Sequence, residues 1–120
     1  FEEVIKSCAN IKRKHEDSTW ISDEFIEAYT NLHHLDIAFS IECYLNEELV
    51  GGLYGILIGD VFCGESMFAK VTDASKVAFY HLCQQAKQNG IKLIDCQVYN
   101  DHLASLGASE ISRDEYFNFL

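Results

Sequence analysis

Hydrophobic residues recur every three to four positions in three segments of the chain, which is the spacing of one helical face. The first segment predicts a helix over residues 1 to about 11. The second predicts a helix from about 23 to 34, with Ser22 as its N-cap, because a serine oxygen can accept a hydrogen bond from the first turn. The third predicts a helix over 73–89, capped by Asp73 or by the threonine before it.

Between the second and third helices the pattern changes to the alternation of β-strands. Strands are predicted over 37–45, 49–58 and 61–63, and the short polar turns between them favour an antiparallel meander. A further strand over 91–98 follows the third helix, and short helices are predicted at 101–106 and 113–119. This order predicts an α/β fold of the α+β type, with a central mixed sheet, flanking helices and a right-handed crossover through the third helix.

Three glycines interrupt the middle strand of the meander, at Gly51, Gly52 and Gly55. Glycine weakens a strand interior unless the backbone uses its missing side chain. The sequence therefore predicts a bulge here, or the close approach of another backbone or a ligand.

The composition indicates one globular domain, since 120 residues that are 48% hydrophobic can bury a single core. No apolar run approaches the ~20 residues that cross a bilayer, and no cleavable export signal is apparent, so no membrane association is expected. The five cysteines are odd in number and widely spaced among apolar neighbours. They predict reduced, buried thiols and a cytoplasmic location.

The formal charge of −10 opposes non-specific binding of nucleic acid, which depends on lysine and arginine. Any RNA contact must therefore be local. The one dense basic cluster is Lys12-Arg13-Lys14. A solvated loop or helix end is the simpler interpretation of such a triplet, and a phosphate contact is the alternative.

Three polar residues stand inside apolar runs. Asp95 and Gln97 are two positions apart on a predicted strand, so both project to one face. A buried carboxylate requires a partner or a function, and the spacing alone leaves two interpretations of Asp95 open, a structural pair or a catalytic group. Glu65 is also charged within an apolar run, and an exposed strand end is its simplest interpretation. Two carboxylates facing one cleft would suit a cationic substrate and help an amine lose its proton.

Other chemistries lack support in the sequence. There is no Cys-x-x-Cys pair, and His33 and His34 are adjacent on a helix and cannot face one ion together, so no metal site is expected. No cysteine has the surroundings of a nucleophile. No glycine-rich phosphate loop is present, and no cofactor is expected.

Five motifs follow one another in a single register. They read Leu-Val-Gly-Gly-Leu-Tyr-Gly at 49–55, Gly-Glu-Ser-Met-Phe at 64–68, Asp-Ala-Ser-Lys at 73–76, Leu-Ile-Asp-Cys-Gln at 93–97 and His-Leu-Ala-Ser-Leu-Gly-Ala at 102–108. Together with Thr-Trp-Ile at 19–21 and Ala-Tyr at 28–29, they closely resemble the leucyl/phenylalanyl-tRNA–protein transferases. The resemblance covers nearly the whole chain.

This resemblance implies a fold similar to the GCN5-related acetyltransferases, with residues 1–120 as a single catalytic domain and the family's smaller N-terminal domain absent. It implies transfer of leucine or phenylalanine, and less well methionine, from aminoacyl-tRNA to proteins with N-terminal arginine or lysine, which marks them for degradation. Leu-tRNA, Phe-tRNA and these acceptor proteins are the implied partners. A monomer is the default expectation.

The resemblance also implies roles for individual residues. Asp95 and Gln97 would orient and help deprotonate the attacking α-amino group, and Glu65 would position the basic end of the acceptor. Trp20 would stack on the 3′-terminal adenosine. Apolar residues are implied to form the aminoacyl pocket, namely Leu53, Phe62, Phe79, Leu82 and Ile94.

Several positions depart from the family pattern. Phe39 replaces a usual histidine, Tyr44 a frequent tryptophan, and Ala69-Lys70 a usual Ser-Arg, while Ala86 would leave the pocket wider. These changes affect details of the RNA and aminoacyl contacts and leave the three polar candidates intact.

Two other functions remain open from the sequence. An acyl-CoA-dependent acetyltransferase would normally carry a glycine-rich loop at the entry to its third helix, where this chain reads Ala-Lys-Val-Thr-Asp at 69–73. A non-catalytic binding module is the second alternative, since an acidic surface suits basic N-termini but repels tRNA.

Overall fold

The computed structural model describes residues 1–15, 22–96, 109 and 111–118. The elements that it contains in these ranges are α1 (Glu2–His15), α2 (Asp23–His34), β1 (Ala38–Leu45), β2 (Glu48–Ile58), β3 (Val61–Ala69), α3 (Ala74–Gln88), β4 (Leu93–Asp95) and α5 (Arg113–Phe117).

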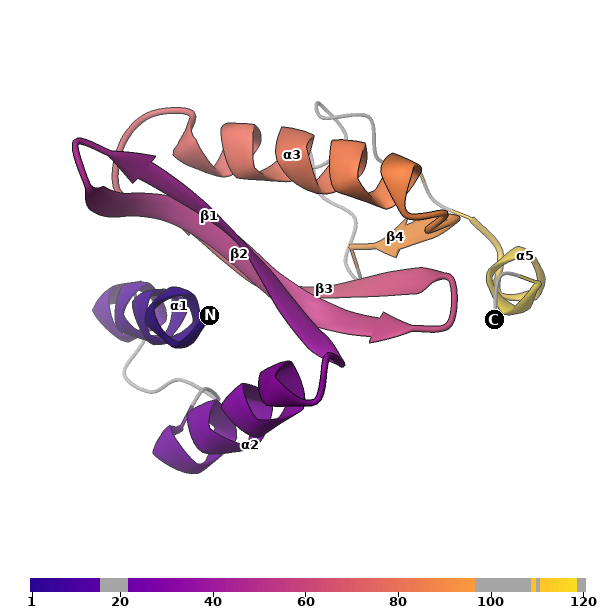
Figure 1. The fold of residues 1–120 in the computed structure, drawn as a ribbon, viewed down its shortest axis with the longest axis horizontal. Coiled ribbons are helices and arrows are strands. Elements are labelled where there is room, and N and C mark those ends of the chain that lie inside the picture. Colours follow the sequence, from indigo (N-terminus) through magenta and orange to yellow (C-terminus); the bar gives the residue numbers. More distant parts are fainter. Residues whose placement is uncertain (16–21, 97–108, 110, 119–120) are drawn as a thin grey trace.

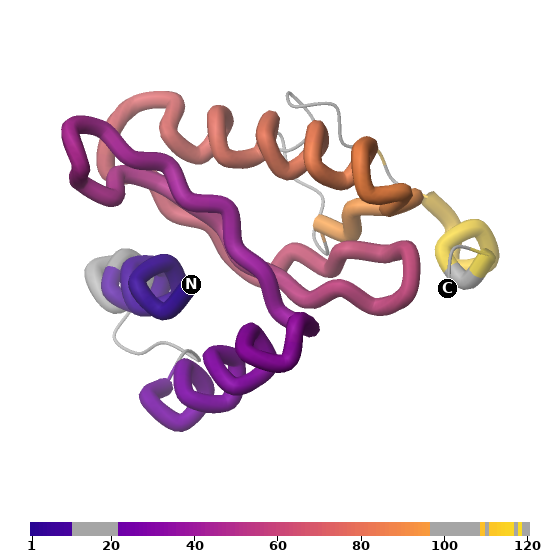
Figure 2. Tube along the Cα trace, in the orientation of Figure 1, coloured from indigo at the N-terminus to yellow at the C-terminus, as the bar shows by residue number. Residues whose placement is uncertain are grey.

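The four strands form one mixed sheet in the order β1-β2-β3-β4. The first three pair antiparallel as the predicted meander, and β4 pairs parallel to β3. Helices α1 and α2 cover one face of the sheet and α3 covers the other (Figure 1). Figure 2 shows how α3 carries the chain back along the sheet, so that β4 can lie beside β3. The predicted mixed α/β class is confirmed.

The three long helices begin close to where the sequence predicts. The Ser22 hydroxyl accepts a hydrogen bond from the Phe25 backbone at 3.2 Å, which confirms the predicted N-cap. Helix α1 extends one turn beyond the predicted end, because Lys and Arg are good helix formers even without an apolar face. The predicted side-chain cap at Asp73 is wrong. Asp73 has a left-handed backbone with φ 67°, and its side chain makes no capping hydrogen bond.

Strand β3 is three times as long as expected, with nine residues instead of three, and contains a bulge. Tyr54 pairs with Ser66 and Gly55 with Gly64, which leaves Glu65 without a partner on β2. The glycines of β2 are explained by close approach, as predicted. A Cβ at Gly51 would lie 2.6 Å from Ala74 Cβ at the start of α3, and a Cβ at Gly55 would collide with the backbone of β3.

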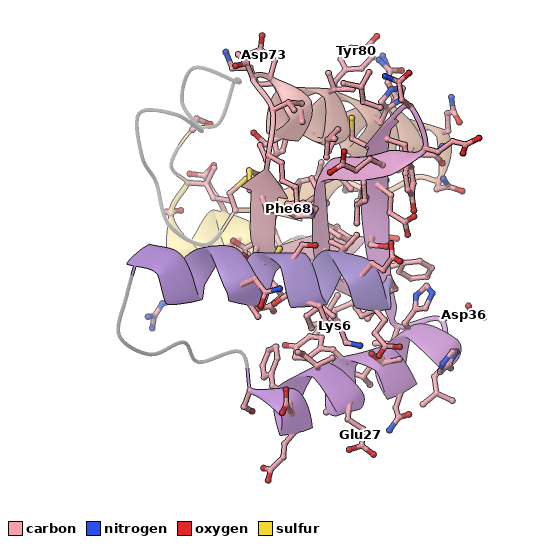
Figure 3. All side chains as sticks on the ribbon, turned by 90° about the vertical axis from the view of Figure 1, so that its left-hand side faces the viewer. Lys6, Glu27, Asp36, Phe68, Asp73 and Tyr80 are labelled. Atoms are coloured by element: carbon pink, nitrogen blue, oxygen red, sulfur yellow. The ribbon has the colours of Figure 1, made fainter. Side chains whose placement is uncertain are left out.

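Each face of the sheet carries its own hydrophobic cluster. The cluster under α1 and α2 comprises Val4, Ile5, Cys8, Ala9, Ile26, Leu49, Tyr54 and Phe68. The cluster under α3 comprises Leu53, Phe62, Ala78 and Leu82, against which partly buried residues pack. Figure 3 shows Phe68 on the sheet beside α1, while Glu27 and Asp36 point into solvent.

The prediction of five buried cysteines is wrong. All five are free thiols, but only Cys8 is buried, and Cys83 is exposed on α3. Its apolar neighbour Leu82 is buried, but adjacent helical residues are about 100° apart, so Cys83 lies on a different side of the helix.

Candidate functional site

A cavity opens where β3 and β4 part. The two strands pair only from Val61↔Leu93 to Cys63↔Asp95, after which β3 continues to Ala69. Beyond this point a cavity of about 240 Å³ is lined by Leu53, Tyr54, Gly64, Glu65, Ser66, Met67, Phe79, Leu82, Ile94 and Cys96. A concave, mostly apolar site with few polar groups is the usual form of a small-molecule pocket.

Four of the five expected pocket residues lie on the wall of this cavity, namely Leu53, Phe79, Leu82 and Ile94. They come from β2, α3 and β4, which the α3-side cluster brings together. Phe62 belongs to that cluster and is only 3% exposed, but it is not on the wall. Ala86 is buried in α3 and is also absent from the wall. Met67 and Cys96 line the cavity without having been expected there.

Glu65 is the one residue with a carboxylate among those that line the cavity. The bulge in β3 explains its position, since the unpaired residue of a bulge is turned away from the regular alternation of the strand. The Glu65 carboxylate also affects the pKa of a residue on α2. Burial raises the pKa of the Tyr29 phenol, and the nearby Glu65 carboxylate raises it further.

Asp95 lies at the end of β4, and its side chain faces away from the α3-side cluster. Phe62 and Ile94 are register partners and both belong to that cluster, so Cys63 and Asp95, the next pair, project to the opposite face. The Tyr116 hydroxyl of α5 donates a hydrogen bond to Asp95 Oδ2 at 2.9 Å. This hydrogen bond, with a smaller contribution from burial, raises the pKa of Tyr116 to about 12.

Cys63 connects the two carboxylates electrostatically. Burial raises the pKa of its thiol, the nearby Tyr116 hydroxyl opposes this, and the negative charges of Asp95 and Glu65 both add to the increase. Both carboxylates therefore lie within electrostatic reach of the same thiol, at the point where β3 and β4 part. Glu65 lines the cavity but Asp95 does not, so the expectation that both carboxylates face one cleft stays a prediction.

Tyr54 of β2 is shared by the α1-side cluster and the cavity. It belongs to the α1-side cluster, is fully buried and also touches the cavity. Its hydroxyl has no hydrogen-bond partner within the described ranges. Burial, followed by the nearby Cys8, Glu65 and Tyr29, raises the pKa of this phenol.

Two expected site residues, Trp20 and Gln97, lie outside the described residues, as do the side chains of Lys12, Arg13 and Lys14. The predicted helix at 101–106 also lies outside them. Within the described ranges, no cluster of three or more His, Cys, Asp or Glu side chains could hold a metal ion. No helix in the same ranges has the length and apolar character needed to cross a membrane.

Sequence reasoning missed Tyr116 as a contact of the site. The sequence predicted a short helix at 113–119, and Ser112 caps it by accepting a hydrogen bond from the Glu115 backbone at 3.1 Å. Nothing in this local pattern identifies Asp95, 21 residues earlier, as the partner of the tyrosine.

Comparison with known proteins gives one consistent result. The family described as leucyl/phenylalanyl-tRNA protein transferase matches residues 1–120. The leucyl/phenylalanyl-tRNA–protein transferase of Flavobacterium johnsoniae is 57% identical over 120 residues, which is all of this chain and 57% of that protein. The protein of the same name from Flavobacterium psychrophilum is 54% identical over the same lengths. The protein of the same name from Hydrogenovibrio crunogenus is 56% identical over 117 residues, which is 98% of this chain and 45% of that protein. The chain thus spans about half the length of these relatives.

Proposed function

The chain belongs to the leucyl/phenylalanyl-tRNA protein transferase family, and from this premise we propose that it carries the catalytic part of an enzyme that transfers leucine or phenylalanine from aminoacyl-tRNA to a protein. The observation that carries the proposal is the family match along all 120 residues. Methionine is the proposed poorer substrate. The acceptor is the α-amino group of a protein with N-terminal arginine or lysine, and the product is marked for degradation.

The cavity supports the aminoacyl part of the proposal. Its wall is mainly aliphatic and aromatic, with Leu53, Phe79, Leu82 and Ile94 among its residues. Such a wall accepts apolar side chains and rejects polar ones, but it separates similar apolar side chains by only about 1–3 kcal/mol. A preference shared by leucine and phenylalanine is therefore what this site chemistry favours.

The reaction proposed here needs little more than alignment and the removal of a proton. The acceptor amine attacks the ester carbonyl, a C–N bond forms, the C–O bond to the terminal ribose of tRNA breaks, and the ribose oxygen leaves with a proton. Because the ester is already activated, holding the amine and ester together supplies much of the rate. Asp95, together with Gln97, would orient the amine and help remove its proton.

The charge distribution suits the proposed acceptor. The Glu65 carboxylate on the cavity wall would attract an arginine or lysine at the acceptor's N-terminus. The net charge of −10 has the same effect at long range but repels tRNA. The contact with tRNA would therefore be local, with Trp20 stacked on the terminal adenosine and Lys12-Arg13-Lys14 as the candidate phosphate contact. We propose a cytoplasmic location, because the proposed donor is charged tRNA.

The test is transfer of labelled phenylalanine from Phe-tRNA to a protein that begins with arginine, using the full-length protein. We expect Asp95→Asn to lower kcat/KM at least tenfold, which corresponds to about 1.4 kcal/mol of transition-state stabilisation. The control is Asp36→Asn, which removes an exposed carboxylate at the end of α2 and should leave transfer within about twofold. Absence of transfer by the unsubstituted protein would contradict the proposed function.

A further inference from the structure

We propose that Tyr116 is a positioning residue for the transfer reaction, because its hydroxyl fixes the orientation of the Asp95 carboxylate. The inference rests on the proposed function, in which Asp95 handles the acceptor amine. It adds a residue of α5 to the site. The sequence alone does not connect this helix with Asp95.

Asp95 is partly buried at the edge of the regular sheet. It is the last residue of β4, a strand of three residues paired with β3. A carboxylate at the end of so short a strand has little regular structure to hold it. A side-chain hydrogen bond from elsewhere is therefore needed if its two oxygens are to keep fixed directions.

Tyr116 provides such a bond from a well-fixed position. Ser112 caps α5 by accepting from the Glu115 backbone at 3.1 Å, and the Tyr116 backbone donates to the Ser112 carbonyl at 3.0 Å. The phenol then donates to Asp95 Oδ2 at 2.9 Å. A donor to a carboxylate forms one of the stronger hydrogen bonds in proteins, so it restricts rotation of the carboxylate about χ2.

The bond engages Asp95 Oδ2 and so limits the directions in which the carboxylate can receive the amine. The phenol also remains a donor over the whole physiological range, because its hydrogen bond to Asp95 raises the pKa of Tyr116 to about 12. A group that neither loses its proton nor touches the reacting atoms can orient its partner, but it does not act as a base.

The experiment compares Tyr116→Phe with Tyr80→Phe in the full-length protein. Tyr80 is the control, since it is exposed on α3 and its substitution also removes one phenol hydroxyl. We expect Tyr116→Phe to lower kcat roughly fivefold while the KM for Phe-tRNA stays unchanged, because alignment of the amine is lost and tRNA binding is not. Tyr80→Phe should change neither value.

A double-mutant cycle with Asp95→Asn separates positioning from a general structural effect. If Tyr116 acts through Asp95, adding Tyr116→Phe to Asp95→Asn should cause little further loss. The inference is overturned if the loss from Tyr116→Phe has its full size in both backgrounds, or if Tyr116→Phe has no effect while Asp95→Asn does. If Asp95→Asn itself leaves transfer unchanged, it is the catalytic role in the proposed function that fails.

Discussion

The two faces of the sheet are built from similar residues but packed to different extents. Under α1 and α2, Val4, Ile5 and Cys8 are fully or almost fully buried. Under α3, Leu53 and Leu82 are buried, but Phe79 on the same helix is only partly covered, and the cavity lies beside it. The first face is a filled core, whereas the second leaves room for a ligand.

This difference separates residues that stabilise the fold from residues available to bind. A filled core gains from every methylene that it removes from water, and loses stability when one is deleted. A cavity wall contributes less to stability, because part of its surface faces a space that a substrate would fill. Substitutions of equal size should therefore lower stability on the α1 face and substrate binding on the α3 face.

The largest expected effect is a loss of stability on the α1 side. Ile5 is 0% exposed, so Ile5→Ala should lower the free energy of unfolding by about 2–5 kcal/mol. Urea denaturation of the full-length protein measures this loss. Transfer per folded molecule should stay close to that of the unsubstituted protein, and a large fall in it would mean that the α1 face takes part in the site.

The sequence carries most of the information on this layered arrangement. Periodicity predicts α1, α2, α3 and the meander, since each buries one face and shows that face in its spacing. The family resemblance also identifies Leu53, Phe79, Leu82 and Ile94, which the structure brings to one cavity.

What the sequence does not reveal depends on contacts between distant segments. The bulge that turns Glu65 is one extra residue of β3 in its pairing with β2, which the spacing within β3 alone does not show. The bond between Tyr116 and Asp95 depends on where α5 lies relative to β4. Burial of Cys8 but not Cys83 depends on which side of each helix meets the sheet.

A smaller effect should appear in the reactivity of cysteines on the two faces. Cys8 is buried in the α1-side core, whereas Cys96 lines the cavity. We expect iodoacetamide to label Cys96 at least about a hundredfold faster than Cys8, because Cys8 becomes accessible only when the core opens. Burial raises the pKa of the Cys96 thiol, so its labelling should accelerate as pH rises from about 7 to 9, where more thiolate forms.

Phe-tRNA provides the control for this labelling. It should slow the reaction of Cys96 by filling the cavity and leave exposed Cys83 unchanged. Quantitative mass spectrometry of the labelled peptides measures all three rates. Equal protection of Cys83 and Cys96 would place the bound aminoacyl group elsewhere.

The central claim, that the α3 face holds the aminoacyl group while the α1 face only stabilises the fold, is tested most directly by two phenylalanines. Phe79 and Phe25 are both partly buried, the first beside the cavity and the second against the α1-side core. The measurement is kcat/KM for phenylalanine transfer, per folded molecule, by full-length Phe79→Ala and Phe25→Ala. We predict at least a tenfold loss for Phe79→Ala, or about 1.4 kcal/mol, and less than about twofold for Phe25→Ala; equal losses in the two variants would contradict the account.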